Sequence, residues 1–259
     1  MSTPGSEPPA RERPAPFPGP APRIGIVDYG MGNRRSVEKS LEHVGAEAFI
    51  SCEHERLRAA DGLLLPGVGA FPAAMEVIRE RGLEALVRER AAAGIPVFGA
   101  CLGMQLLFER SSEHGGADGL GLLSGEVRAL RASGLKLPHI GWTAVRWLRA
   151  ASGLTAEAEE RDAGDAHPRG WPLSDGLPDP AYLYHVHSFV AVPADDAVVL
   201  GQADYGEPFA AVVGRGRVFG TQSHPEKSST HGLRLLRNFA AVCAEAAATA
   251  NPAGGVTVP

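Results

Sequence analysis

The sequence predicts an α/β protein whose central sheet is mostly parallel and covered by helices on both faces, with antiparallel strands added. Two observations lead to this prediction. In the first half of the chain, short β-rich runs alternate with helical patterns, which is typical of βαβ units. In the second half, runs rich in Val, Tyr and Phe follow one another with few helix signals between them.

The expected elements follow one another in chain order. In the first half they are a strand in "RIGIVDYG" (23–30), a helix in "NRRSVEKSLEHVGA" (33–46), a strand in "DGLLLPG" (61–67), a helix over 72–93, a strand over 96–100 and a helix over 102–109. In the second half they are strands in "EVRAL" (126–130), "HIGWTAVRWL" (139–148), "AYLYHVHSFVAV" (181–192), "AVVLGQAD" (197–204) and "FAAVVGRGRVFGTQSH" (209–224), and a closing helix over 229–250. Cys243 lies on the apolar stripe of that helix, so we expect it to be buried.

A single domain over residues 23–248 accounts for these elements. Residues 1–22 hold eight prolines and no apolar run, so we expect a disordered tail there. The polar, Pro- and Gly-rich segment 150–180 is typical of a surface insertion within the domain. Residues 249–259 are expected to form a second disordered tail.

Composition narrows the possible partners and the compartment. The chain has 25 Lys and Arg against 30 Asp and Glu and no long basic block, which argues against binding to nucleic acid or anionic lipid. No apolar stretch reaches the length of a membrane-spanning helix. The three cysteines are widely spaced and form no CxxC pair, which argues against a disulfide framework or a zinc site. We therefore expect a cytoplasmic protein with no metal or other cofactor.

A cysteine lies at one strand-to-helix junction. Cys101 follows the strand 96–100 and precedes Leu102, and Gly99 and Gly103 permit a tight turn there. Ligands of open α/β sheets bind outside the carboxyl ends of the strands. A helix N-terminus also favours a thiolate and offers backbone N–H groups to an oxyanion. These local features fit a nucleophile and a buried structural cysteine equally well.

The segment "FGTQSHPEKS" (219–228) supplies a base and a carboxylate. Pro225 restricts His224 to an extended conformation, which places the side chains of His224 and Glu226 on the same side of the chain. The carboxylate can then orient the imidazole. With Cys101 these residues make a Cys-His-Glu triad of nucleophile, general acid–base and orienting carboxylate. Taken alone, the segment also fits a loop that holds a hydrogen-bonded histidine.

A third strand end, in "LLLPGVGAF" (63–71), contains two glycines. Gly67 and Gly69 flank Val68, and their flexibility allows a backbone N–H to join that of Leu102 in stabilising an oxyanion. A simple turn is the alternative. Nucleophile, base and oxyanion donors at one edge of a sheet indicate an acyl-transfer site.

These motifs resemble those of a known family. "GACLGMQLLFE", "LLLPGVGAF" and "SHPEKS" resemble class I glutamine amidotransferases, and "DYGMGN", "PHIGW" and "VHSF" are similar to the glutaminase subunits of imidazole glycerol phosphate synthases. The resemblance implies a flavodoxin-like three-layer fold and hydrolysis of glutamine at Cys101. It also implies a heterodimer with a (βα)8-barrel cyclase subunit, which receives the ammonia and makes imidazole glycerol phosphate and AICAR in histidine biosynthesis.

The resemblance also implies roles for individual residues. The residues expected in the glutamine pocket are Gly69, Gln105, Glu113, His187, Ser188 and Phe189. Those expected on the face toward the barrel are Asn33, Trp142 and Lys227.

Four positions depart from the family pattern, and none lies in the triad. Thr143 stands where Asn is usual, His185 where an aromatic residue is usual, and Phe189 where Tyr is usual. Arg34 replaces a residue that is commonly apolar. Because Phe189 lacks a hydroxyl, we expect only backbone contacts to the substrate's α-carboxylate there.

Two other functions fit parts of the sequence. A stand-alone cysteine hydrolase of the same fold uses the same triad, but it needs no exit for ammonia, so Trp142 and Asn33 argue against it. A catalytically idle scaffold subunit needs no triad, so the intact Cys101, His224 and Glu226 argue against that function.

Overall fold

The computed structural model describes residues 15–148 and 171–250. Within them, nine strands form one sheet in the order β2-β1-β3-β4-β13-β12-β11-β8-β9, and four form a smaller sheet in the order β10-β7-β5-β6. The elements, with short 3₁₀ helices marked η, are in chain order β1 (Arg23–Val27), α1 (Arg34–His43), β2 (Glu47–Ser51), α2 (His54–Arg58), β3 (Gly62–Leu65), α3 (Phe71–Glu80), α4 (Leu83–Ala92), β4 (Val97–Ala100), α5 (Leu102–Leu106), β5 (Phe108–Ser111), η1 (Glu113–Gly115), β6 (Ala117–Asp118), β7 (Leu123–Ala129), β8 (His139–Trp147), η2 (Pro172–Ser174), β9 (Ala181–His187), β10 (Phe189–Pro193), η3 (Asp196–Val198), β11 (Val199–Asp204), β12 (Pro208–Arg215), β13 (Val218–Thr221), η4 (Pro225–Lys227) and α6 (Ser229–Ala250).

The larger sheet confirms the predicted fold class. Its first five strands, β2, β1, β3, β4 and β13, are parallel neighbours, in the strand order of flavodoxin-like sheets. From β13 onward the sheet continues through antiparallel pairs to β12, β11, β8 and β9. The expected antiparallel addition is therefore confirmed as well.

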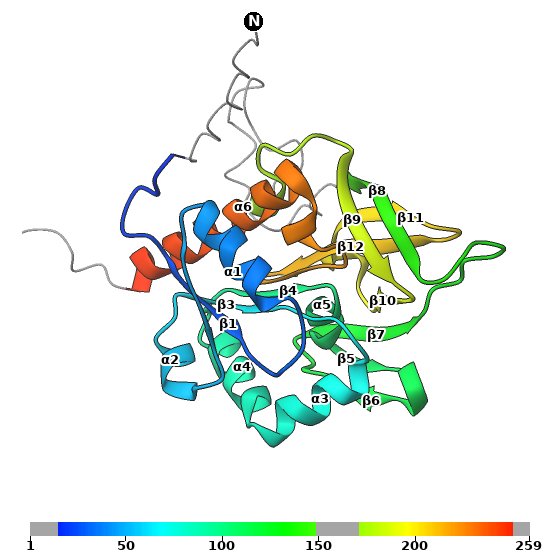
Figure 1. The fold of residues 1–259 in the computed structure, drawn as a ribbon, viewed down its shortest axis with the longest axis horizontal. Coiled ribbons are helices and arrows are strands. Elements are labelled where there is room, and N and C mark those ends of the chain that lie inside the picture. The colour runs from blue at the N-terminus through cyan, green and yellow to red at the C-terminus, as the bar shows by residue number, and fades with distance from the viewer. Residues whose placement is uncertain (1–14, 149–170, 251–259) are drawn as a thin grey trace, which may run out of the picture.

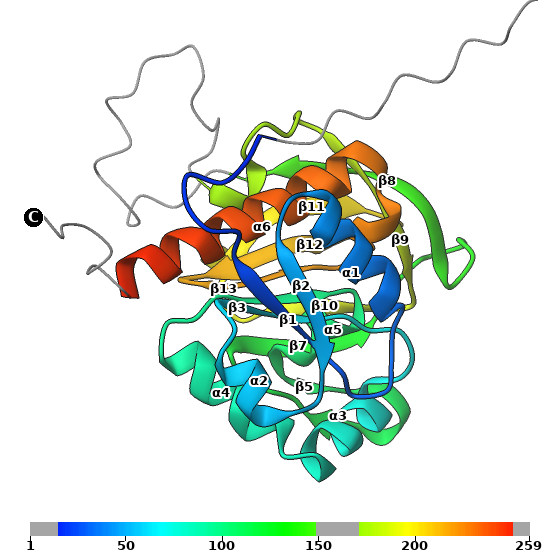
Figure 2. The ribbon, with the colours of Figure 1, turned by 60° about the vertical axis from the view of Figure 1, so that its left-hand side comes forward.

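Helices cover both faces of the parallel strands. Figures 1 and 2 show α1 and α6 on one face and α2, α3 and α4 on the other. Alternate strand residues feed the two cores: Leu64 packs into the core that includes α1 and α6, and Leu63 and Leu65 pack into the core that includes α3 and α4. This two-sided burial explains why the parallel strands are continuous apolar runs.

Several predicted elements differ from the observed ones. The helix expected over 72–93 is two helices, because Gly82 adopts a left-handed conformation (φ 66°) between α3 and α4. The helix expected over 102–109 ends at Leu106, and the chain then enters β5 of the smaller sheet. The run 181–192 is divided at Ser188 into β9 and β10, which belong to different sheets. The prediction omitted β2, α2, β5 and β6, and it gave β12 and β13 as one run.

The predicted tails and insertion are narrower than expected. Residues 15–22 are described, and Phe17 is only 8% exposed, with the Arg237 guanidinium 3.5 Å from the centre of its ring. Residues 171–180 are also described, and Trp171 and Leu177 are buried in the core with α6. Helix α6 reaches Ala250, two residues past the expected domain end at 248. The remaining parts of these predicted segments, 1–14, 150–170 and 251–259, lie outside the described residues.

Candidate active site

Cys101 occupies a tight turn between β4 and α5. Its backbone has φ 53° and ψ −110°, a strained conformation for a residue with a side chain, and its N–H donates to the Thr221 carbonyl over 2.8 Å. The two flanking glycines are required by space. A Cβ at Gly103 would lie 1.9 Å from the Leu65 carbonyl oxygen, and one at Gly99 would lie 2.4 Å from the Gly103 carbonyl oxygen. Close packing of helix against strands therefore holds the cysteine in the turn.

His224 and Glu226 lie together on the segment that follows β13. His224 Nδ1 is 3.0 Å from Glu226 Oε1, and both side chains are buried. The His224 backbone is fixed at both ends: its N–H donates to the Tyr184 carbonyl (2.8 Å), and its carbonyl accepts from the Ser228 hydroxyl (2.7 Å). Because a carboxylate only accepts, His224 Nδ1 bears a proton. The other ring nitrogen, Nε2, is left for the hydrogen bond with Cys101.

The environment keeps His224 protonated. Burial lowers the pKa of His224, but its hydrogen bonds with Cys101 and Glu226 outweigh burial and raise the pKa to about 10. At neutral pH the imidazolium therefore lies between a carboxylate and the cysteine. A proton donor is thus available beside the cysteine.

The expected oxyanion segment lies directly beside the cysteine turn. Gly67 is buried, and a Cβ on it would lie 2.5 Å from Tyr29 Oη and 2.8 Å from Leu102 Cβ. The Tyr29 hydroxyl donates to the Pro66 carbonyl, and burial, reinforced by the charge of Cys101, raises its pKa far above the usual range, so it remains a donor. Val68 is exposed, and Gly69 has a φ of 111° that favours glycine. The segment is thus held at Pro66 and open at its tip.

Two of the predicted substrate residues meet at one backbone carbonyl. The Phe189 carbonyl accepts from Gln105 Nε2 (3.1 Å) and from His187 Nδ1 (3.0 Å). Gln105 Nε2 also donates to Gln222 Oε1 over 3.1 Å, and Gln222 Nε2 is 3.8 Å from Cys101 Sγ. Hydrogen bonds therefore connect Gln105, His187 and the Phe189 carbonyl to Gln222, which contacts Cys101. The sequence analysis did not single out Gln222.

Glu113 and Ser188 are held by backbone groups. Glu113 Oε2 accepts from the Phe71 N–H over 2.7 Å at the start of α3, just after Gly69, and this carboxylate is mostly buried. The Ser188 carbonyl accepts from the Leu130 N–H over 2.9 Å, at the bend between β9 and β10. Backbone N–H groups therefore hold the carboxylate of Glu113 and the backbone carbonyl of Ser188.

A hydrogen-bonded chain of histidines runs from β8 to Phe189. Burial and the neighbouring His139 lower the pKa of His187 to about 3, so His187 is neutral. Since the Phe189 carbonyl only accepts, the proton of His187 is on Nδ1, and its Nε2 accepts from His139 Nδ1 (3.2 Å). His139 Nε2 then accepts from the Thr143 hydroxyl (2.8 Å). The hydroxyl of Thr143, which stands where Asn is usual in the family, is therefore used in a hydrogen bond inside the protein.

His185 is the least satisfied of the buried histidines. Its Nδ1–H donates to the Leu183 carbonyl over 3.0 Å, and its buried Nε2 has no hydrogen-bond partner among the described residues. Burial, with the neighbouring His187 and His139, lowers the pKa of His185 well below its usual value. The departure from an aromatic residue therefore places a neutral, half-paired imidazole in the core.

The residues expected on the partner face lie on neighbouring elements. Asn33 precedes α1, Lys227 lies in η4, and Trp142 in β8 pairs with a residue of β9; η4 contacts both α1 and β9. All three residues are exposed, Trp142 by 52%. Ile140 (61%) and Tyr182 (52%) on the same pair of strands are exposed as well. Together with Trp142 they form an apolar patch on β8 and β9, here called the β8–β9 patch.

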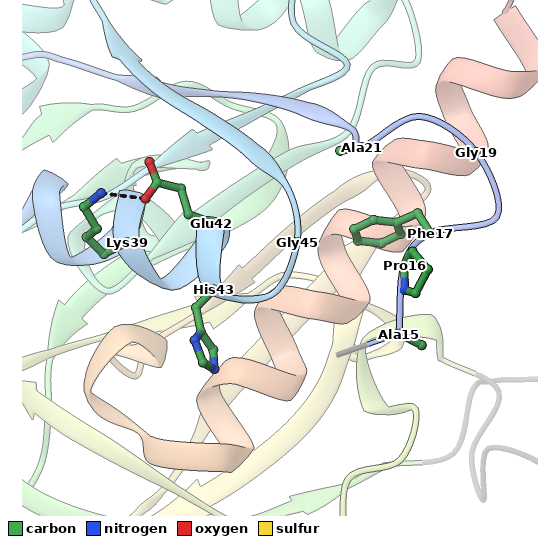
Figure 3. Close-up of a pocket in the computed structure, with 9 residues that line it drawn as sticks. All are labelled: Ala15, Pro16, Phe17, Gly19, Ala21, Lys39, Glu42, His43 and Gly45. Atoms are coloured by element: carbon green, nitrogen blue, oxygen red, sulfur yellow. Dashed lines mark hydrogen bonds and ion pairs between the residues drawn. The ribbon is translucent and has the colours of Figure 1, made fainter. Parts of the chain in front are cut away.

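A separate hollow of about 880 Å³ lies between the N-terminal segment and α1. Figure 3 shows its lining, with Phe17 on one side and the Lys39–Glu42 ion pair on the other. It contains none of the triad residues.

Within the described parts of the chain, no group of three or more His, Cys, Asp or Glu side chains is placed to hold a metal ion. No helix in residues 15–148 or 171–250 has the length and apolar character needed to cross a bilayer.

Comparison with known proteins gives consistent results. The family model for class I glutamine amidotransferases matches residues 25–243. A Bacillus cereus protein named imidazole glycerol phosphate synthase subunit HisH is 46% identical over 85% of this chain and 94% of its own length. A Moorella thermoacetica protein of the same name is 44% identical over 83% and 93%. A crystal structure of a glutamine amidotransferase matches with a TM-score of 0.63 at 21% identity, covering 85% of this chain and 98% of that chain, which supports the fold.

Proposed function

Because the chain belongs to the class I glutamine amidotransferase family, we propose that it hydrolyses glutamine to glutamate and ammonia with Cys101, His224 and Glu226. The observation that supports this most is the buried arrangement of a cysteine in a strained turn with an imidazole held by a carboxylate 3.0 Å away. We infer that it works as the glutaminase subunit of imidazole glycerol phosphate synthase, since relatives of that name cover most of its length.

The first half of the reaction releases ammonia. The Cys101 thiolate attacks the carbon of the glutamine side-chain amide, and its carbonyl oxygen becomes an oxyanion. Backbone N–H groups of Leu102 and of the segment Gly67–Gly69 stabilise this charge. His224 gives its proton to the amide nitrogen, the C–N bond breaks, and ammonia leaves a thioester on Cys101.

The second half of the reaction restores the enzyme. Neutral His224 takes a proton from water as the water oxygen attacks the thioester carbon, and the C–S bond breaks to give glutamate and the thiolate. Glu226 holds the ring through Nδ1 during both proton transfers and stabilises the imidazolium. In this scheme His224 acts as the acid in the first half of the reaction and as the base in the second half. The contacts that fix its ring and its backbone keep it in place for both proton transfers.

The ammonia is proposed to pass to a (βα)8-barrel cyclase subunit in the cytoplasm, which makes imidazole glycerol phosphate and AICAR in histidine biosynthesis. The β8–β9 patch supports a protein partner, because an exposed cluster of Ile140, Trp142 and Tyr182 is typical of an interface. Asn33 and Lys227 lie on adjacent elements and would add polar contacts at its rim.

The proposal is tested with the Cys101→Ala variant in complex with the cyclase subunit. We expect glutamine-dependent synthesis to be lost and synthesis from added ammonium salts to remain, since only the nitrogen source is removed. Equal loss with both nitrogen sources would contradict the division of roles. Failure of the chain to co-purify with the cyclase, combined with rapid hydrolysis of glutamine by the chain alone, would instead indicate a stand-alone hydrolase.

A further inference from the structure

A second side chain besides His224 contacts the nucleophile. Gln222 is fully buried just after β13, and its Nε2 lies 3.8 Å from Cys101 Sγ, within hydrogen-bond range for sulfur. Its backbone N–H donates to the Ala211 carbonyl of β12 over 2.8 Å, so the residue is anchored in the sheet. The mechanism above assigns it no role.

The orientation of the Gln222 amide follows from its neighbours. The Phe189 carbonyl can only accept, so the Gln105 group that faces it is the NH₂ group. The same NH₂ group is 3.1 Å from one end of the Gln222 amide, which must therefore be the oxygen. The nitrogen of Gln222 is left facing the Cys101 sulfur.

The opposite orientation is unfavourable at both ends. Turning the Gln222 amide over would place its NH₂ group against the NH₂ group of Gln105, two donors with no acceptor between them. It would also place the amide oxygen against the sulfur, where it would repel a thiolate. The Val186 carbonyl already lies 3.8 Å from the sulfur, and it can accept from the thiol but not bind the thiolate. An N–H donor to the same sulfur offsets that preference for the thiol.

We propose that Gln222 is a further catalytic residue, which donates a hydrogen bond to the Cys101 thiolate, and that Gln105 is a positioning residue that holds it in this orientation. The inference deepens the proposed function, because it concerns the same nucleophile. A donor to the charged form of a group favours that form, so Gln222 adds to the stabilisation from His224. The titratable groups that interact with the sulfur are His224 from the segment after β13 and Tyr29 from the segment after β1.

The test measures how fast iodoacetamide alkylates Cys101 as a function of pH, with the modified peptide quantified by mass spectrometry. A Cys52→Ala background removes the exposed cysteine, and Cys243 is buried. In Gln222→Met, which keeps the length of the side chain without its donor, we expect the alkylation midpoint to rise by about half to one pH unit. The rate below the midpoint should fall about 3- to 10-fold. Gln202→Met, a change of an exposed glutamine on β11, is the matched control.

Gln105→Met provides a second measurement, in which the Gln222 side chain that contacts the Cys101 sulfur is itself unchanged. It releases the Gln222 amide, so the midpoint should move upward by a smaller amount. If Gln222→Met does not fold, this variant decides the question. If a folded variant had an alkylation midpoint within about 0.2 pH unit of that of the Cys52→Ala background protein, the inference would be overturned. Alkylation does not require glutamine, so a shifted midpoint in a protein that fails to hydrolyse glutamine would support the Gln222 assignment and contradict only the proposed function.

Discussion

The His224 ring lies between two groups that favour its charged form, and this predicts how the reaction depends on pH. Because hydrogen bonds with Cys101 and Glu226 raise the pKa of His224 to about 10, the proton that leaves with ammonia is available throughout the neutral range. We expect glutaminase activity to fall only as the pH rises toward 10. In Glu226→Gln this alkaline limb should move to lower pH by about one unit, since a charged acceptor is lost. The pH profile of kcat/KM, measured in the complex, checks both statements.

The size of the activity loss in Glu226→Gln distinguishes a role of Glu226 in orienting the His224 ring from a role in proton transfer. The neutral amide can still accept from Nδ1, so activity should fall by less than the roughly 10² to 10⁴-fold that loss of proton transfer costs. His224→Ala should show the larger loss and is the comparison. An unchanged pH profile in Glu226→Gln would mean that a different group orients the ring.

The sequence indicated the residues of the proposed triad because backbone restrictions surround them: glycines flank Cys101, and Pro225 separates His224 from Glu226. Gln222 lies in the same quoted segment as His224, yet its position at the sulfur depends on Gln105, 117 residues earlier. A neutral amide has no signature of its own in a sequence. Its role became visible only when the fold fixed its orientation.

At the scale of elements, the histidines on β8 and β9 predict a stability that depends on pH. Among the described residues, the buried Nε2 of His185 has no hydrogen-bond partner, so His185→Phe should raise the free energy of unfolding by about 1–2 kcal/mol at pH 7.5. The folded wild type keeps His185 neutral, whereas the unfolded chain binds a proton below about pH 6.5. The wild type therefore loses stability as the pH falls below that value, and the advantage of the variant should grow by up to about 1.4 kcal/mol per pH unit.

Urea denaturation at pH 7.5 and 5.5 measures this difference. His43→Phe is the control, because that side chain on α1 is exposed. If His185→Phe gave the same change in unfolding free energy at both pH values, the imidazole would not be held neutral in the folded state.

Element types followed from residue patterns more reliably than element ends. The apolar runs of β3 and β4 are explained by burial on both faces, and they were recognised as strands. The break at Gly82 was missed because the apolar positions on both sides continue a helical period, and only the left-handed φ of 66° divides them. The division at Ser188 was missed because both strands are apolar, and which sheet each joins is a tertiary property.

At the scale of the whole molecule, Phe17 links the N-terminal segment to the body of the protein. Its ring packs against Arg237 of α6, whose guanidinium also donates to the Ala15 and Val44 carbonyls. Phe17→Ala should lower the free energy of unfolding by about 2–4 kcal/mol, through lost burial and a lost cation–π contact. Phe17→Leu, which keeps most of the apolar volume, should cost about 1–2 kcal/mol. Glutaminase turnover should be unchanged in both variants, because the triad is elsewhere.

Deletion of residues 2–22 should destabilise the fold to a similar extent, contrary to what the composition of that segment indicates. Deletion of residues 2–14 leaves Phe17 in place and is the matched comparison. Equal melting temperatures for the two deletions would show that Phe17 contributes no stability in solution. The proline content of the segment hid this contact, since one aromatic residue among eight prolines gives no periodic pattern.

At the same scale, we expect the segment Gly67–Gly69 to be the element through which a partner controls the site. The segment Gly67–Gly69 is anchored where Tyr29 holds the Pro66 carbonyl, and its tip at Val68 is exposed. Rotation of a peptide bond at the tip would exchange a carbonyl for an N–H toward the reacting carbon, and one such donor is worth roughly 10² to 10³ in rate. A partner that binds one orientation better than the other shifts that equilibrium. We therefore expect the chain alone to hydrolyse glutamine slowly, and the cyclase with its ligand to stimulate it.

Gly69→Ala tests this control. Its φ of 111° is unfavourable for alanine, while a Cβ there would meet only Met31 Sδ at 3.7 Å, so the change acts on backbone conformation rather than on packing. Stimulated turnover should fall by about 10-fold or more, with little change in the Kd for glutamine. Gly216→Ala, at a φ of 58° in the turn between β12 and β13, is the control for backbone strain away from this segment, because among the described residues no atom beyond its own chain neighbours lies within 4 Å of the added Cβ. If the chain alone hydrolysed glutamine as fast as the complex with its ligand, the segment Gly67–Gly69 would not be a switch, and its glycines would serve only to fit the chain past Tyr29 and Leu102.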